Sequence, residues 1–154
     1  MNRSIIDEYE AGADKLIKAT AGMTPADLSA APIPGKWSTH QVVVHLADAE
    51  SAFADRIRRI VAEDEPLLLA WDENKFVQRL HYEAQSATDA VELIALTRRQ
   101  ITRILRVLPD ADFYRVGRHS ERGPQTIIDV LGYAVPHLDH HLKFVAEKRK
   151  ALGK

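Results

Sequence analysis

Four stretches of the chain carry apolar residues at the three- and four-residue spacing of an amphipathic helix. They run from Ser4 to Ala21, from Ser38 to about Ala62, from Thr88 to just before Pro109, and from Thr126 to about Leu152. Two of these stretches begin with the residues of a helix N-terminal cap. Gln41 follows Ser38 by three residues, and Asp129 follows Thr126 by three residues. The pattern therefore predicts four long helices, each with one buried face.

The connections between these helices are polar and unequal in length. The segment from Asp64 to Ala84 is irregular apart from a short helix expected around Asp72–Arg79, and Tyr114–Gln125 forms a second polar loop. No alternating pattern of useful length predicts a strand. Long connections are typical of a bundle with crossovers rather than simple hairpins. We therefore expect an all-α four-helix bundle that occupies one domain, residues 1–154.

Composition narrows the class of protein. With 154 residues, 45% hydrophobic and 28% charged, the chain resembles an ordinary globular domain. It contains no apolar run long enough to span a bilayer, and its first residues lack the apolar core of a secretion signal, so we expect a cytoplasmic protein. A net charge of −1 gives no sign of nucleic-acid binding. The expected partner is a small-molecule substrate.

The chain contains no cysteine. This excludes disulfides, thiolate metal ligands and a cysteine nucleophile. If the protein carries out thiol chemistry, the sulfur must arrive with a cosubstrate.

Three histidines fall where the predicted helices would face one another. On a helical wheel, His45 lies on the margin of the apolar stripe of the second helix, and His141 lies on the margin of the stripe of the fourth. His137 lies just beyond that margin, about one helical turn before His141. His140 points toward the solvent-facing side.

Two interpretations of these histidines fit the spacing. Histidines at a helix margin are ordinarily amphipathic residues with an apolar body and a polar tip. Alternatively, three neutral imidazoles from separate segments form a metal site with positions left open for water or substrate. Imidazole suits Zn, Ni, Cu and Fe. The spacing alone favours neither interpretation.

A proline lies inside the fourth predicted helix, directly before His137. Pro136 removes a backbone hydrogen bond and its ring presses on the carbonyl group of Gly132, four residues earlier. We expect a bend at this point. The bend either wraps the helix around the core or aims His137 at His45, and the sequence leaves both interpretations open.

Two motifs extend this reading across nearly the whole chain. Trp37-Ser38 precedes the segment His45–Glu50, and Thr126–Leu131 leads into Pro136–His141. In this order they resemble the DinB-like superfamily. The resemblance implies a four-helix bundle of up-up-down-down connectivity and a divalent metal held by His45, His137 and His141. The expected metal is Zn²⁺ or Ni²⁺, with Fe²⁺ or Mn²⁺ as alternatives.

The resemblance also implies an activity and an assembly. The better-understood members of the superfamily are thiol-dependent enzymes, namely bacillithiol S-transferases and a mycothiol-dependent maleylpyruvate isomerase, and many others are named as metal-dependent hydrolases without a known substrate. We therefore expect an S-transferase that uses a low-molecular-weight thiol, with a hydrolase as the alternative. Members are often dimeric, and the apolar residues Ile57 and Val61 suggest an exposed helix face for a homodimer.

Either reaction needs a group that accepts a proton. Asp48, one turn after His45, is the candidate for a general base or for a carboxylate that orients an imidazole, although it also fits an ordinary solvated helix residue. Glu50 is expected to pair with Arg56. A zincin-type metalloprotease is excluded, because Leu138 stands where that motif places its glutamate.

A protein of another class, a non-catalytic bundle that binds a small ligand around a vestigial metal site, also fits the sequence. A closed site without solvent access would favour this binding module, and an open crevice beside the histidines would favour the enzyme. The loop residues expected to line the entrance of such a crevice are His81, Tyr82, Arg118 and His119.

Overall fold

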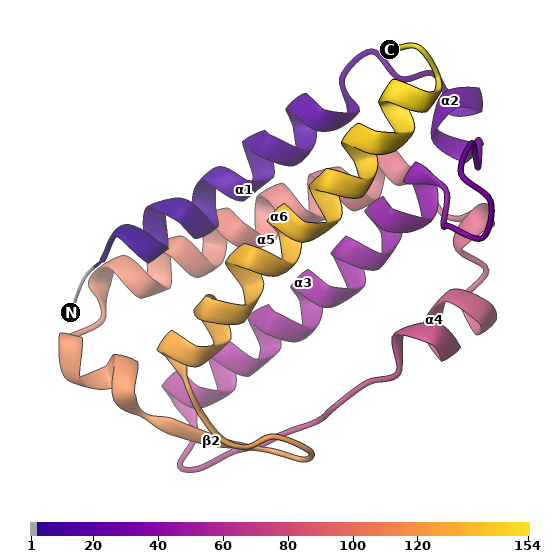
Figure 1. Cartoon of the computed structure of the whole chain (residues 1–154). Coiled ribbons are helices and arrows are strands. Elements are labelled where there is room, and N and C mark those ends of the chain that lie inside the picture. Colours follow the sequence, from indigo (N-terminus) through magenta and orange to yellow (C-terminus); the bar gives the residue numbers. More distant parts are fainter. Residues whose placement is uncertain (1–2) are drawn as a thin grey trace.

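The computed structural model describes residues 3–154. Four long helices form a bundle (Figure 1), as expected for an all-α fold: α1 (Ser4–Thr20), α3 (Thr39–Ala62), α5 (Ala87–Val107) and α6 (Ile127–Ala151). Each begins and ends within about a residue of the predicted bounds. The shorter elements are α2 (Pro25–Ser29), α4 (Glu73–Arg79) and two 3₁₀ turns, Tyr82–Ala84 and Asp110–Tyr114. Met1 and Asn2 lie outside the described residues.

Capping boxes fix where α3 and α6 begin. The Ser38 hydroxyl accepts the backbone N–H of Gln41 at 3.1 Å, while the Gln41 side chain accepts the N–H of Ser38 at 2.9 Å. Thr126 and Asp129 make the same reciprocal pair at the start of α6. Because a helix fixes the direction of every later side chain, these caps also set the faces on which His45 and His137 lie.

The helix directions follow the order up, down, down, up along the chain (Figure 1). Arg3, at the start of α1, donates to the carbonyl oxygen of Leu108 just after α5, so these helices are antiparallel. Arg149, near the end of α6, donates to the carbonyl oxygen of Ala19 near the end of α1, so that pair is parallel. The long crossover between α3 and α5 thus joins two parallel neighbours in the middle of the chain. The expected up-up-down-down order would have made α1 parallel to α3 and α5 parallel to α6, and this detail was wrong.

A small sheet, which the sequence did not predict, closes one end of the bundle. It consists of β1 (Leu67–Leu68), β2 (Val116–His119) and β3 (Gly123–Thr126), with β1 parallel to β2 and β2 antiparallel to β3. Strands of two to four residues are too short to show alternation. Their pairing depends on the two polar connections meeting in space, which only the folded bundle brings about.

The core fills the space between the four helices, and it also includes residues that we expected outside. Ile57 is 0% exposed and Val61 packs against the same cluster. The apolar face suggested for a homodimer is therefore largely used by the bundle itself. The homodimer stays a prediction without that structural support.

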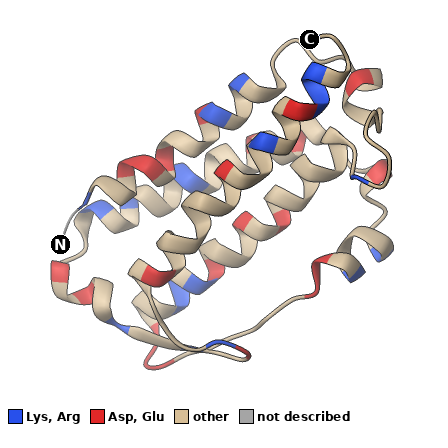
Figure 2. Cartoon of the chain, viewed as in Figure 1, with Lys and Arg blue, Asp and Glu red and all other residues tan. Residues whose placement is uncertain are grey.

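Charged residues of both signs are interspersed along the helices (Figure 2). The last turn of α6 carries Lys148, Arg149 and Lys150, cations that favour a helix C-terminus. No helix within residues 3–154 is long and apolar enough to cross a membrane.

Candidate metal centre

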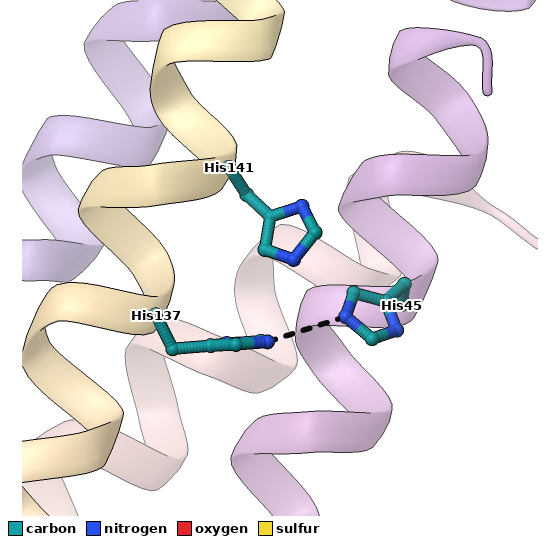
Figure 3. A group of neighbouring side chains, drawn as sticks. All are labelled: His45, His137 and His141. Atoms are coloured by element: carbon teal, nitrogen blue, oxygen red, sulfur yellow. Dashed lines mark hydrogen bonds between the residues drawn. The ribbon is translucent and has the colours of Figure 1, made fainter. Parts of the chain in front are cut away.

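The structure brings His45, His137 and His141 together (Figure 3). His45 projects from α3, and the other two project from α6 one turn apart. One ring nitrogen from each histidine lies within 4.8 Å of the other two. The Nε2 atoms of His45 and His137 are 3.3 Å apart. Residues separated by 92 positions in the sequence thus face each other across the gap between two helices.

The donor set fits a divalent metal. Two nitrogen ligands at ~2.0–2.1 Å from a tetrahedral ion lie ~3.4 Å apart, close to the separation of the His45 and His137 Nε2 atoms. The same separation also suits an N–H···N hydrogen bond between the rings. That bond leaves the third ring unexplained, whereas a metal accounts for all three nitrogens converging on one point.

The protonation state of the rings also suits metal binding. Burial lowers the pKa of His45 to about 4, with a further contribution from His137. Burial likewise lowers the pKa of His137 to about 4 and that of His141 to about 3. All three imidazoles are therefore neutral near pH 7, and each has a lone pair available for coordination.

Aromatic packing holds the His45 ring in place. Trp37 meets it edge-on with ring centroids 5.2 Å apart, and Trp71 lies on another side at 5.6 Å. The Nδ1 atom of His45 is buried and has no hydrogen-bond partner within the described residues. Packing between two indoles, rather than a hydrogen bond to the second ring nitrogen, therefore orients this imidazole. Trp37, the first residue of the Trp37-Ser38 motif, therefore contacts the centre directly.

Two cavities open beside the histidines. One, of about 290 Å³, is bordered by His137 together with Trp71, Glu73 and His119. The other, of about 420 Å³, is bordered by both His137 and His141 together with Trp37 and Glu73. Both cavities are open to solvent, so the centre is accessible to a small molecule from two sides.

Glu73 is the site residue that the sequence reasoning missed. Its Oε2 atom lies 3.9 Å from Nε2 of His45, and its side chain is 56% exposed. It is the first residue of α4 and borders both cavities. The sequence predicted the short helix, but no pattern along the chain relates Glu73 to His45. The crossover between α3 and α5 brings the two residues together.

Asp48 does not border either cavity. Its carboxylate accepts a hydrogen bond from the Tyr82 hydroxyl. Burial and this bond raise the pKa of Tyr82 above its usual value, so the phenol remains a neutral donor. The catalytic role of Asp48 stays a prediction, and the observed contact links α3 to the turn that precedes α5.

The expected entrance residues divide into two groups. His119 is buried and borders the smaller cavity. Tyr82 is fully buried and borders neither cavity, whereas His81 and Arg118 are exposed and interact with Glu83 and Glu65, respectively. Of the four, His119 alone borders either cavity next to the histidine cluster.

Two further expectations concern neighbouring residues. His140 lies outside the three-histidine cluster and is exposed, in agreement with its place on the wheel. The pairing of Glu50 with Arg56 was wrong. Glu50 instead forms a buried ion pair with Arg98 of α5 at 2.8 Å. The sequence could not show this contact, because Arg98 belongs to a helix 48 residues away.

Comparison with known proteins identifies the family. The family model described as the DinB superfamily matches residues 8–145. The chain belongs to the DinB superfamily. A protein of Bacillus subtilis, named "Putative metal-dependent hydrolase YfiT", is 27% identical over 140 residues, which cover 90% of this chain and 79% of that protein. A protein of Oceanobacillus iheyensis with the same description is 29% identical over 75% of this chain and 68% of its own.

Two solved structures share the bundle. The structure of YfiT from Bacillus subtilis, titled as having "an unusual four-helix bundle topology", aligns with a TM-score of 0.88 and 26% identity over 97% of this chain and 86% of that chain. A second four-helix bundle protein aligns with a TM-score of 0.65 and 22% identity over 94% of this chain and 97% of its own. The latter likeness concerns the fold alone.

Proposed function

We propose that this protein is a divalent-metal-dependent enzyme that joins the sulfur of a low-molecular-weight thiol to a small electrophilic substrate. The observation that carries the proposal is that the cluster of His45, His137 and His141 reaches two solvent-open cavities, through His137 in both and through His141 in the larger one. An enclosed cluster would have favoured the non-catalytic binding module. The absence of cysteine means that the sulfur comes from the cosubstrate.

The three histidines would hold the cation. When bound, a divalent metal supplies positive charge that lowers the pKa of a thiol or water beside it and polarises an electrophile. The chain keeps the imidazoles neutral by burying them, and Trp37 and Trp71 fix the His45 ring. Zn²⁺ and Ni²⁺ are the ions that we propose, since both accept imidazole nitrogen.

A carboxylate beside the centre would accept the proton of the thiol. Glu73 has an oxygen 3.9 Å from Nε2 of His45 and borders both cavities, which makes it the better placed acceptor. As the sulfur forms its bond to the electrophilic carbon, the leaving group departs with the bonding electron pair and the proton passes to Oε2 of Glu73. The alternative acceptor, Asp48, already accepts the Tyr82 hydroxyl.

Metal-dependent hydrolysis is the second candidate. It is favoured by the names of relatives in Bacillus subtilis and Oceanobacillus iheyensis, which describe them as putative metal-dependent hydrolases. Water would take the place of the thiol, and the same carboxylate would accept its proton. The two reactions differ in whether a thiol is consumed.

The test uses protein loaded with Zn²⁺ or Ni²⁺ and a panel of small electrophiles, each assayed with and without bacillithiol, mycothiol or glutathione. We expect faster loss of an electrophile with a thiol, and loss of this difference in His137→Ala. His140→Ala is the matched control, since His140 lies one helical turn or less from both ligands on α6 and outside the cluster. Glu73→Gln should lower the rate by ~10²-fold, the usual effect of losing an acid–base group, and Asp48→Asn should lower it less.

Equal rates with and without thiol, combined with sensitivity to His137→Ala, would support hydrolysis instead. If Asp48→Asn has the larger effect, Asp48 rather than Glu73 accepts the proton. No metal-dependent turnover in any assay would contradict the enzyme and favour the binding module.

A further inference from the structure

A buried arginine without a carboxylate partner lines the smaller cavity, which also reaches His137. Arg56 on α3 is only 7% exposed. Its Nη2 donates to the carbonyl oxygen of Leu69 at 2.8 Å, and within residues 3–154 it forms no ion pair. A guanidinium carries five N–H donors, so most of those on Arg56 have no protein acceptor. A buried charge whose N–H groups lack acceptors destabilises the fold, and a bound anion would supply those acceptors.

A second arginine borders the same cavity. Arg122, in the turn between β2 and β3, lies with its guanidinium 4.1 Å from the centre of the Tyr133 ring and has no ion-pair partner within the described part of the chain. Burial, followed by the positive charge of Arg122, lowers the pKa of Arg56. A guanidinium group carries a positive charge throughout the physiological pH range. The two like charges therefore act on each other, and neither forms an ion pair with a carboxylate of the described residues.

His119 adds a neutral donor. Its Nδ1 accepts the backbone N–H groups of Glu121 and Arg122 at 3.2 and 3.3 Å, which places the ring proton on Nε2. Burial, and then the charges of Arg56 and Arg122, lower the pKa of His119, so the ring is neutral near pH 7. The small sheet thus brings His119 and Arg122 to the cavity that Arg56 borders from α3.

The acidic residues that border the cavity do not pair with its arginines. Glu73 and Glu121 also border it, but both are exposed and neither forms an ion pair with Arg56 or Arg122. Glu73 instead lies next to His45. Arg56 also borders a second hollow with Asp55 and Arg59, and those two pair with each other at 3.0 Å. The same cavity is thus bordered by both arginines and by His137.

We propose that Arg56, His119 and Arg122 bind an oxyanion group, a carboxylate or a phosphate, of the small molecule on which the histidine centre acts. The planar fork of a guanidinium matches two oxygens of either group. A cavity of about 290 Å³ accommodates a small ligand, with the oxyanion at the arginines and the reacting carbon toward His137. This inference rests on the proposed function and narrows its substrate class to anionic molecules.

The test measures binding rather than turnover and uses metal-free protein, so that no ligand oxygen is held by a metal. Benzoate, phenyl phosphate and the neutral benzamide are titrated by calorimetry at low ionic strength. We expect one of the two anions to bind at least ~10-fold more tightly than benzamide, as expected for a charge-assisted pair worth ~1.4 kcal/mol or more. Whichever anion binds more tightly identifies the oxyanion as carboxylate or phosphate.

Variants assign the binding to the arginines. Arg122→Gln, at an exposed position that should not disturb folding, and Arg56→Gln should each weaken binding of that anion ~10-fold. Lys36→Gln is the matched control, because Lys36 is a cation bordering the larger cavity beside the same histidines. Its anion affinity should stay within ~2-fold of the unmodified protein. A thermal melt of Arg56→Gln separates loss of binding from loss of fold. If Arg56→Gln does not fold, the anion affinity of Arg122→Gln tests the proposal by itself.

Equal affinity for benzamide and the anions, or unchanged anion affinity in Arg122→Gln, would overturn the proposal. The result is independent of the proposed activity. Arginine-dependent anion binding without metal-dependent turnover would retain this site and contradict the enzyme. Turnover without anion binding would retain the enzyme and contradict this site.

Discussion

Arg98 on α5 and Glu50 on α3 form an ion pair of 2.8 Å in which both side chains are almost completely buried. The Tyr9 hydroxyl of α1 donates to the other oxygen of Glu50, and Nη1 of Arg98 donates to the carbonyl oxygen of Tyr9 at 2.7 Å. One polar network therefore links three helices through the core. Its members satisfy one another, which is the condition under which a buried ion pair is tolerated.

Gly12 makes room for this network, and Gly12→Ala should destabilise the fold. A β-carbon at this position of α1 would overlap with Nη1 of Arg98. We expect a loss of about 1–3 kcal/mol of unfolding free energy from overpacking, even though alanine favours a helix over glycine. Urea denaturation measures the change.

Gly132→Ala is the control for that substitution. An added β-carbon on Gly132 in α6 meets no atom within 4 Å. This variant should be unchanged or stabilised by up to ~1 kcal/mol. If Gly12→Ala proved as stable as Gly132→Ala, this result would contradict the close approach of the Arg98 side chain to Gly12 of α1.

Metal binding should depend on His141 and not on His140. Protein purified without an affinity tag should contain about one divalent ion per chain, as expected for a three-ligand site. His141→Ala should lose this ion because it removes one of three converging nitrogens. His140→Ala should retain it. Elemental analysis by mass spectrometry gives the metal content, and an equal loss in both variants would contradict the assigned ligands.

The metal-free protein should become less stable as the pH falls from about 6.5 to about 4. Burial lowers the pKa of His45 and His137 to about 4, while an unfolded histidine has a pKa of ~6.5. Between these values the unfolded chain binds more protons than the folded chain, so the unfolding free energy rises with pH. His141, with a pKa of about 3, acts in the same direction.

Urea midpoints at pH 5.5 and pH 7 measure this dependence above the range in which most carboxylates titrate. Replacing His137 with glutamine should reduce the difference between the two midpoints, since one buried titrating ring is removed. An unchanged difference would mean that His137 is not held neutral by burial.

The homodimer is best tested directly by light scattering. The family resemblance predicts a mass near twice the 17.3 kDa of one chain at micromolar concentration. Ile57, one of the two residues first considered for the interface, is buried in the bundle and should not affect assembly. A mass near that of one chain would contradict the dimer.

Local patterns determined the helices and the relative placement of two of the three histidines of the centre. Apolar spacing and the caps at Ser38 and Thr126 predicted the bounds of α3 and α6, because capping and amphipathicity involve residues three or four positions apart. The four-residue spacing of His137 and His141 placed both rings on one side of α6 for the same reason. The position of His45 on the helical wheel indicated that it faces another helix, but it could not give the distance between His45 and the histidines of α6.

Only the tertiary structure determined which side chains from other parts of the chain contact these helices and the histidines. The crossover brings Glu73 to His45, the paired strands bring His119 and Arg122 to the cavity that Arg56 borders, and Glu50 finds Arg98 rather than Arg56. The bounds of a helix depend on its own residues, whereas these contacts depend on helix directions and on loops that pair only after the bundle has formed. Side chains far apart in the sequence carry no local signal of their partners, so packing, not periodicity, determined the chemistry around the histidines.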